Sequence, residues 1–397
     1  MAVRHFCGWG ASGFEAHVDL TCTHPVPLNV LYSEQLADNP SKVIRIRDPL
    51  RRLAEAHVVS CAPLEALRGM ADPAAALAGV DAVFLHLVDF NSQSAPWMAP
   101  LLAAALGAGV ALICDTDDPY FFPADGVSFD ADLAPHLDLM KRLCGSAHVV
   151  TVTTPTLKQE LGSYARNIMV VPNMIDTDAW PQRAGNNARV RVGWCGGPTH
   201  ADDLTLLLPA VAALQRQTDV EFVIFGMFDQ NFDGTVQKAR QVTSKARAQN
   251  PAVAAFGRMA DALEGVTYQH VPSVPYDAFP ARLAALNFDI GVCPLQDTRF
   301  NRCRSAVKFY QYVVSNTVTV ASRVAAYQGE CDLLADNTQA GWLAQLQMLV
   351  HDEQRREQAL AEQKRYVNAN RSWHVGLPLY TKLFTAVCAA VKHKAHT

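Results

Sequence analysis

Residues 293–312 read Cys293-Pro-Leu-Gln-Asp-Thr-Arg-Phe-Asn-Arg-Cys-Arg-Ser-Ala-Val-Lys-Phe-Tyr-Gln-Tyr312, and the apolar run Val318-Thr-Val-Ala-Ser322 follows. This order predicts a strand, a polar loop, a helix over residues 306–314 and a second strand, which together form a βαβ unit. Arg304 and Ser305 lie directly before the helix. Since the N-terminus of a helix offers free backbone N–H groups and the positive end of the dipole, the loop predicts an anion site.

The same alternation of short apolar runs and helical patterns extends over most of the chain. Strands are expected at residues 27–33, 58–62, 82–87, 110–114, 149–152 and 168–171, and again at 190–194, 220–225, 265–270, 288–293 and 318–321. Strands separated by helices at this spacing favour parallel sheets covered on both faces. The fold class is therefore α/β.

A polar stretch without periodicity, residues 172–187, separates the two sets of strands and is the best candidate for a linker. A chain of 397 residues also exceeds what one hydrophobic core usually serves. We therefore expect an N-terminal Rossmann-like domain at residues 1–175 and a second at 188–370. Residues 371–397 are expected to form a helix that returns to the first domain.

Composition excludes several classes of protein. Only 18% of the residues are charged and the net charge is −4, which does not fit a protein that coats nucleic acid. The ten cysteines are scattered, without a C-x-x-C pair or zinc-site spacing, which favours reduced thiols in the cytoplasm. The N-terminus lacks the apolar core of a secretion signal, and no apolar run approaches the length of a membrane span. Any membrane contact is expected to be peripheral.

A glycine loop opens the second set of strands, in the segment Gly193-Trp-Cys-Gly-Gly-Pro-Thr-His200. Gly196 and Gly197 let the backbone approach a ligand where a Cβ would obstruct it. The loop is not the dinucleotide fingerprint G-x-G-x-x-G, so the sequence does not support NAD binding. The alternative is a tight turn in which Thr199 or Asp202 caps the following helix.

Three segments together resemble retaining glycosyltransferases of the GT-B fold, of the bacterial group 1 or family 4 type. One is Val171-Pro-Asn-Met-Ile-Asp176, at the end of the first domain, and the second is the glycine loop. The third holds Pro294-Leu, Phe300-Asn, Arg304-Ser and Lys308-Phe-Tyr-Gln-Tyr312. Their order and spacing on both sides of the linker match the family.

The resemblance implies two Rossmann-like domains that face each other across a cleft, with C-terminal helices packing back toward the first domain. It implies transfer of a sugar from a UDP- or GDP-type donor to an acceptor, with retention and without a metal or other cofactor. The residues expected to bind the donor are Gly196, Gly197, Thr199, His200, Asp297, Arg304, Ser305, Lys308 and Gln311. Cationic side chains among them would stabilise the departing diphosphate.

The sequence departs from the family at three positions. The family often has two glutamates eight positions apart, the second of which binds the donor ribose, and this chain has Cys303 and Gln311 there. A glutamine keeps hydrogen-bonding capacity but loses the charge-assisted bonds of a carboxylate. Met174 replaces the glycine of the Pro-Asn-Gly element. A nucleotide-sugar-binding homologue without turnover is therefore an alternative.

Polar residues near the ends of first-domain strands predict the acceptor side. Asp115 and Asp117, in Cys114-Asp-Thr-Asp-Asp118, are the candidate catalytic residues, and Asp118, Lys42, Arg45 and His86 are candidate acceptor contacts. Helix capping and metal binding are alternatives for the carboxylates, a structural role for His86, and solvated charges for the loop at residues 34–45. The expected acceptor is a glycan or lipid-linked saccharide, and a modified base in DNA is the alternative.

Overall fold

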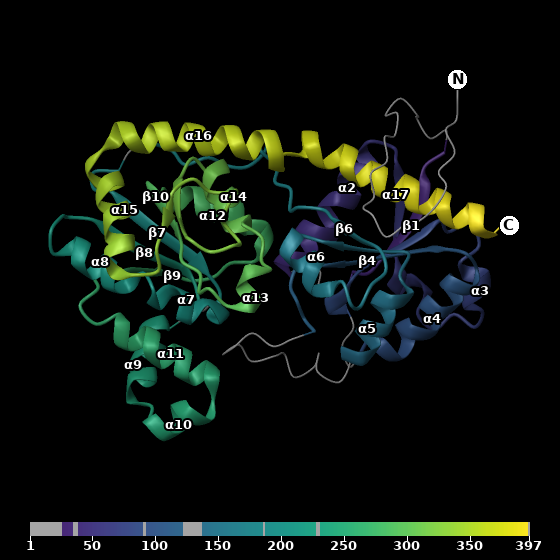
Figure 1. The fold of residues 1–397 in the computed structure, drawn as a ribbon, viewed down its shortest axis with the longest axis horizontal. Helices are drawn as coiled ribbons and strands as arrows, with labels where there is room; N and C mark the ends of the chain where they lie inside the picture. The colour runs from purple at the N-terminus through teal and green to yellow at the C-terminus, as the bar shows by residue number, and fades with distance from the viewer. Residues whose placement is uncertain are drawn as a thin grey trace.

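The computed structural model describes residues 26–34, 39–89, 93–121, 137–185, 187–227 and 231–395. Within these ranges the chain forms two parallel sheets of six strands each, and both sheets are covered by helices (Figure 1). The first sheet has the strand order β2-β1-β3-β4-β5-β6 and the second the order β12-β11-β10-β7-β8-β9. Residues 1–25, and residues 35–38 in the loop after the first strand, lie outside the described part of the chain.

The first domain contains the first sheet and its helices. Its strands are β1 Leu28–Tyr32, β2 Val59–Pro63, β3 Ala82–His86, β4 Ala111–Thr116, β5 Val149–Val152 and β6 Ile168–Val170. Its helices are α1 Pro40–Lys42, a π-helical turn Val43–Arg47, α2 Asp48–Glu55, α3 Pro73–Ala76, α4 Ala95–Gly107, α5 Leu137–Ser146 and α6 Pro155–Leu161. Every residue of β3, β4 and β5 is buried, as expected for a parallel sheet covered on both faces.

The second domain begins after the linker. Its strands are β7 Arg191–Gly196, β8 Glu221–Gly226, β9 Gln269–Val271, β10 Ile290–Cys293, β11 Val318–Ser322 and β12 Leu334–Ala335. Its helices are α7 Ala201–Thr205, α8 Leu208–Gln215, α9 Phe232–Gln241, α10 Ser244–Gln249, α11 Pro251–Ala262, α12 Phe279–Leu286, α13 Arg299–Arg302, α14 Val307–Val314 and α15 Gln339–His351. The βαβ unit expected from residues 293–322 is therefore β10, α14 and β11, and these two strands pair in parallel.

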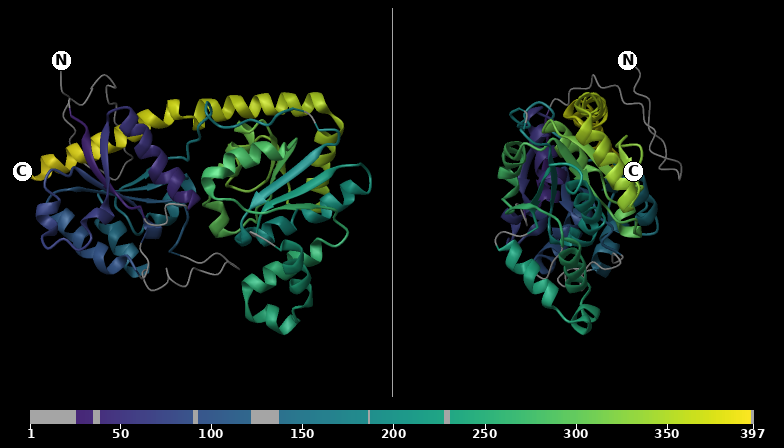
Figure 2. Two further views of the ribbon diagram at one scale, coloured as in Figure 1. Left: turned by 180° about the vertical axis from the view of Figure 1, so that it is seen from behind. Right: turned by 90° about the vertical axis from the view of Figure 1, so that its left-hand side faces the viewer.

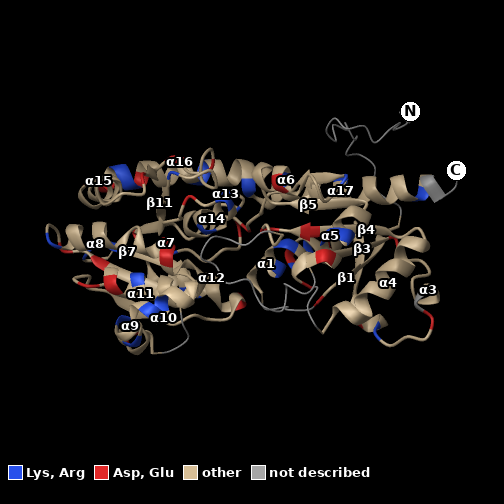
Figure 3. Ribbon diagram, turned by 60° about the horizontal axis from the view of Figure 1, so that its bottom comes forward, with Lys and Arg blue, Asp and Glu red and all other residues tan. Residues whose placement is uncertain are grey.

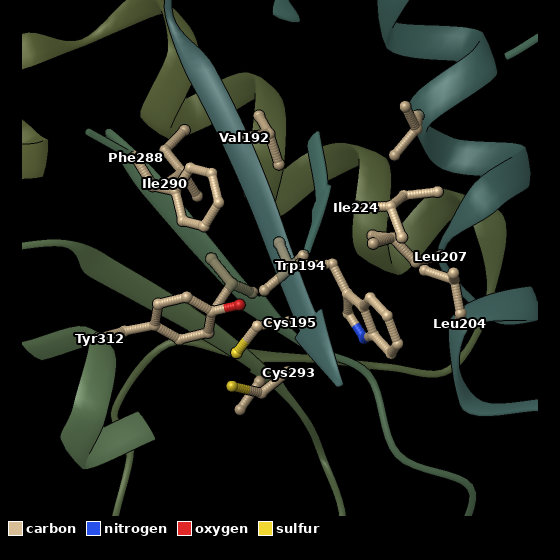
Figure 4. Close-up of a cluster of buried hydrophobic side chains, with 14 of the residues drawn as sticks. Val192, Trp194, Cys195, Leu204, Leu207, Ile224, Phe288, Ile290, Cys293 and Tyr312 are labelled. Atoms are coloured by element: carbon tan, nitrogen blue, oxygen red, sulfur yellow. The ribbon is translucent and has the colours of Figure 1, made fainter. Parts of the chain in front are cut away.

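The core around β7 explains why its sequence contains a glycine. Val192 and Trp194 point into the apolar cluster shown in Figure 4, while the Phe288 ring covers Gly193. A Cβ on Gly193 would lie 2.2 Å from the Phe288 ring, and the Tyr312 hydroxyl donates to the Gly193 carbonyl at 3.2 Å. The strand therefore sits too close to its neighbours for any side chain at this position.

Two long helices join the domains along one side of the molecule. Helix α16, Glu353–Arg371, packs on the second domain, and α17, Trp373–Ala395, follows it over the first domain (Figure 2). Tyr380, Phe384 and Val387 of α17 are buried in the same core cluster as β1 and β3. The C-terminal segment therefore returns to the first domain, and the linker pairs with it through a bridge between Ile175 and Ser372.

The structure corrects three details of the sequence-based expectations. Strand β9 spans Gln269–Val271, later and shorter than the expected 265–270, and helices α9 to α11 were not predicted. The segment Trp373–His393 has the length and mean hydropathy, 1.3, of a membrane-spanning helix, although no such segment was expected. Since one face of this helix forms part of the first-domain core, its apolar character has a structural explanation.

Candidate functional site

A cavity of about 810 Å³ lies between the two domains, at the carboxyl ends of both sheets. The first domain contributes Asn39, Pro40, Ser41, Ile44, Arg45, Asp117, Asp118 and Asn173. The second contributes residues 195–200 and 225–227, Ser273, Val274, Pro275, Tyr276, Phe279, Leu295, Arg304, Ser305, Val307, Lys308, Gln311 and Tyr327. In the second sheet β7 lies next to β10 and the chain order reverses between them, which is where open α/β sheets bind ligands.

Lys308 gives the cavity a cation without an anionic partner. It is the second residue of α14, and its ammonium lies 5.5 Å from the centre of the Trp194 ring. Within the described part of the chain, Lys308 forms no hydrogen bond or ion pair. Burial and the nearby Arg304 lower the pKa of Lys308, so the site as it stands disfavours its charge. An anion bound in the cavity would remove this cost.

Glycines allow the backbone to lie close to this cation. A Cβ on Gly196 would lie 2.7 Å from the Trp194 ring and 3.0 Å from Lys308 Nζ, whereas Gly197 is open toward the cavity. Thr199 also lines the cavity and is exposed, and helix α7 has no side-chain hydrogen bond at its N-cap, His200. The geometry therefore gives no support to the alternative in which Thr199 or Asp202 caps the helix.

Residues 303–305 form the point where the second domain meets the first beside the cavity. Arg304 Nε lies 3.4 Å from Asp118 Oδ1, and Asn173 Nδ2 donates to the Ser305 hydroxyl at 2.8 Å. Thr154 donates to the Cys303 carbonyl at 2.8 Å. The loop before α14 is thus held by contacts from both domains.

An aromatic wall forms another side of the cavity. Tyr276 stacks on Phe279 with ring centres 5.9 Å apart, and Phe279 stacks on Phe225 at 5.5 Å. Gln311 is buried and its Nε2 donates to the Tyr276 hydroxyl at 3.2 Å. A flat apolar surface beside a polar amide and a phenol suits a ligand with a planar ring and hydroxyl groups.

On the first-domain side, Asp117 and Asp118 face the cavity. His86 Nε2 lies 3.1 Å from Asp117 Oδ1, and the Tyr120 hydroxyl donates to the same oxygen at 3.3 Å. Burial acts to raise the pKa of Asp117, but the contact with His86, together with Ser41 and Arg45, holds this pKa below its usual value. Burial raises the pKa of Asp118 to about 6, although Arg304 acts in the opposite direction.

Asp115 and Arg45 form a buried pair rather than two free cleft residues. The guanidinium donates to both Asp115 oxygens, at 3.0 and 2.6 Å, and Thr151 donates to Oδ2 at 2.5 Å. Both side chains of the pair are fully buried. Arg45 lines the cavity, but its Nη1 donates to the Val171 carbonyl and to Asn173 Oδ1. This location fits a structural role in orienting Asn173.

The other predicted residues that do not line the cavity are Lys42, His86 and Asp297. Lys42 is buried and donates to Asp89 Oδ1 at 2.7 Å, and His86 is buried behind Asp117. Asp297 is half exposed and pairs with Arg302 at 2.6 Å, on the outer side of the loop. The predicted donor residues apart from Asp297 are brought together at the cavity, along with Arg45, Asp117 and Asp118.

Asn173 and Tyr327 line the cavity but were not predicted as site residues, and Tyr276 was expected only as the end of the segment 270–276, whose backbone would contact the nucleobase. Asn173 belongs to the Pro-Asn element of the linker. Because this element is one of the segments that resemble the GT-B family, the sequence did contain a signal for Asn173. Tyr276 begins a short 3₁₀ helix and Tyr327 lies in a turn after β11, and neither segment has a distinctive local pattern. Only the sheet topology, which places both segments at the carboxyl ends of the strands, identifies them.

No protein-family model matches the chain, and no curated protein matches it in sequence. Solved structures do resemble it in fold. A glycosyltransferase from Rickettsia africae superposes with a TM-score of 0.60 at 10% identity, over 91% of this chain and 98% of that one. A UDP-forming α,α-trehalose-phosphate synthase from Burkholderia vietnamiensis gives 0.59 at 14% identity, over 94% and 99%. A variant of S. aureus TarM in complex with UDP gives 0.53 at 10% identity, over 79% and 58%. The expected GT-B fold is confirmed.

Proposed function

We propose that the protein is a glycosyltransferase that moves a sugar from a nucleoside-diphosphate donor to a hydroxyl of an acceptor. The observation that carries the proposal is Lys308, a cation without an anionic partner among the described residues, beside Arg304 at the switch point of the second sheet. The fold agrees with it, because the similar structures include a UDP-forming enzyme and a UDP complex. We therefore favour a UDP-type donor over a GDP-type one.

In the proposed reaction, the bond between the anomeric carbon and the donor phosphate oxygen breaks, and a bond from that carbon to the acceptor oxygen forms. The acceptor proton passes to the leaving diphosphate. Lys308 and Arg304 stabilise the negative charge that grows on this diphosphate, so the proposal requires no metal. We propose retention at the anomeric carbon, by a reaction on one face of the sugar.

The first-domain lining supports an uncharged, hydroxyl-bearing acceptor such as a glycan. Among the described residues there, Arg45 is committed to Asp115, and the carboxylates that line the cavity are Asp117, which His86 contacts, and Asp118, which Arg304 contacts. A phosphorylated acceptor or DNA would meet these carboxylates, and Arg304, which lies beside Asp118, is already assigned to the donor diphosphate. In the view of Figure 3, Lys and Arg positions are scattered among Asp and Glu positions instead of forming one stripe. These observations disfavour the DNA alternative.

We also propose the cytoplasm as the compartment, with peripheral membrane contact only if the acceptor is linked to a lipid. The cysteines in the described part of the chain, eight in number, are all free. Thiols that remain reduced are typical of cytoplasmic proteins.

The test of the function is nucleotide binding by calorimetry, with a panel of nucleoside diphosphates, followed by an assay of donor hydrolysis and transfer. We expect UDP to bind, and Lys308→Met to weaken its binding about tenfold or more, because a hydrogen bond to a charged group is worth about 1.5–3 kcal/mol. Lys238→Met is the matched control, since Lys238 is exposed on α9 of the same domain.

The outcomes separate the alternatives. Binding together with transfer supports the enzyme. Binding with neither hydrolysis nor transfer favours the nucleotide-sugar-binding homologue without turnover. If no nucleoside diphosphate binds, or if Lys308→Met and Lys238→Met bind UDP equally well, the assignment of the cavity to a donor diphosphate is wrong.

A further inference from the structure

A buried histidine and aspartate lie next to Arg304. His200 ends the turn after β7, and Asp203 lies on α7 three residues later. His200 Nδ1 and Asp203 Oδ2 are 2.7 Å apart, and both side chains are largely buried. The pair is close enough to the cavity to act on it, because His200 is one of the lining residues.

Arg304 determines which ring nitrogen of His200 carries the proton. Arg304 Nη1 lies 3.2 Å from His200 Nε2. A guanidinium can only donate, so Nε2 must accept and the proton of the neutral ring must lie on Nδ1. There it points at the Asp203 carboxylate. Burial and the charges of Lys308 and Arg304 lower the pKa of His200 to about 3, so the ring remains neutral at physiological pH.

Asp203 is itself fixed by the loop that follows β10. Its Oδ1 accepts the backbone N–H of Gln296 at 2.7 Å. Asp203 therefore connects the backbone of one loop to the ring of His200, and His200 connects to the guanidinium of Arg304. With Nδ1 directed at Asp203 and Nε2 at Arg304, both ring nitrogens are already used within the protein.

We propose that His200 and Asp203 are positioning residues that hold the Arg304 guanidinium against the donor diphosphate. The inference rests on the proposed function, because it takes the diphosphate as the ligand of Arg304. His200 supplies a neutral acceptor that orients the guanidinium without reducing its charge, and Asp203 keeps the ring in the required tautomer. His200 then acts through Arg304 and does not contact the donor.

Two substitutions at one position separate this role from simple packing. In His200→Gln, the amide oxygen can take the place of Nε2 and accept from Arg304, whereas His200→Phe fills the volume without an acceptor. We expect His200→Phe to lower kcat about tenfold to a hundredfold, because a displaced catalytic group costs that much, with a smaller change in the KM for the donor. His200→Gln is expected to stay within about threefold of the native kcat.

Asp203→Asn tests the tautomer. The new amide group can donate to His200 Nδ1, which stabilises the tautomer of His200 with its proton on Nε2. That proton would point at the Arg304 guanidinium, which then has no acceptor on the ring. We expect a loss of kcat similar to that of His200→Phe. If His200→Phe and His200→Gln have equal kcat values at equal thermal stability, or if His200→Phe has the native kcat, the proposed role is wrong.

A spectroscopic measurement tests the same geometry without any nucleotide. With ¹⁵N-labelled histidine, the signals missing in His200→Gln are those of His200. We expect a neutral ring with its proton on Nδ1 down to pH 5. A ring protonated on Nε2, or one that titrates near its ordinary pKa, would overturn the inference even if the protein binds UDP. Conversely, if the histidine signals are as expected but the protein binds no nucleotide, the hydrogen-bond geometry of His200 is upheld and the proposed function is rejected.

Discussion

Gln311 occupies the position at which the resembled family carries the glutamate that binds the donor ribose. The side chain lies on α14, it is buried, and its Nε2 donates to the Tyr276 hydroxyl. The amide oxygen remains as the acceptor for a ribose hydroxyl. A neutral amide and a phenol therefore stand where the family uses a carboxylate.

Gln311→Glu tests this assignment. The carboxylate would accept charge-assisted hydrogen bonds from the ribose, which are roughly twice as strong as bonds between neutral groups. We expect the KM for the donor to fall about three- to tenfold, which corresponds to about 0.7–1.4 kcal/mol. The measurement is steady-state kinetics with varied donor. The control is Gln354→Glu, because Gln354 is exposed on α16. Unchanged donor affinity and rate would mean that the ribose binds elsewhere.

The pairing of charges explains which site residues can be predicted from sequence. Lys308 and Arg304 were predicted because their loop has a local signature. Lys42 and Arg45 also looked like cleft residues, but the structure pairs them with Asp89 and Asp115. Those partners are 47 and 70 residues away, so no local pattern reveals them. Sequence identifies the ionisable residues near strand ends, whereas only the fold shows which of them are already neutralised.

At the scale of elements, the strands that the sequence predicts most clearly are those buried on both faces of their sheet. Strands β4 and β11 are buried along their whole length and consist mostly of apolar residues, and α14 has apolar residues at helical spacing. Helices α9 and α10 have few buried side chains, or none, so their sequences carry little periodicity. Their existence depends on the connection between β8 and β9, which local sequence does not indicate.

Helix α17 is the element whose apolar character has two explanations, a membrane span and a core face. The structure favours the core face, because Phe384 is fully buried and its ring meets that of Phe84 edge to face at 5.3 Å. We expect Phe384→Ala to lower the free energy of unfolding by about 3–5 kcal/mol, as for other buried aromatic residues. Urea unfolding measures the change.

Val375→Ala is the control on the same helix, since Val375 is 41% exposed. Its effect should stay within about 0.5 kcal/mol. If Phe384→Ala is as harmless as Val375→Ala, α17 does not belong to the first-domain core, and the membrane explanation gains support.

At the scale of the whole molecule, the contacts between the two domains around the cavity combine exposed ion pairs with the buried Cys303. Two of the ion pairs that join the domains, Arg47 with Asp277 and Arg299 with Glu160, have exposed arginine side chains, whereas Arg304 with Asp118 is more buried. Exposed pairs are worth about 0–1 kcal/mol each. The chain crosses between the domains in two places, the linker and the junction of α16 and α17, and these lie together at the bridge of Ile175 and Ser372. This arrangement permits a hinge motion in which the cavity opens on the opposite side.

Cys303 reports on that motion. It belongs to the second domain, yet it is fully buried in the core cluster of the first domain, and burial raises its pKa to about 12. Its thiol becomes accessible only when the domains separate, whereas Cys144 lies in the first-domain core and requires that domain to unfold. We therefore expect a thiol reagent to label Cys303 faster than Cys144 in the protein without ligand, as followed by peptide mass spectrometry.

A donor nucleotide that contacts Lys308 and Arg304 should bind the closed arrangement and suppress opening. If it binds only that state, UDP at 100 times its Kd slows labelling of Cys303 by up to about a hundredfold. Labelling of Cys61 provides the control, since this partly exposed residue lies on the edge strand β2 of the first domain. Labelling of Cys303 at the Cys144 rate with or without UDP would mean that the domains do not separate. If UDP binds but leaves the rate for Cys303 unchanged, closure of the domains is independent of the donor.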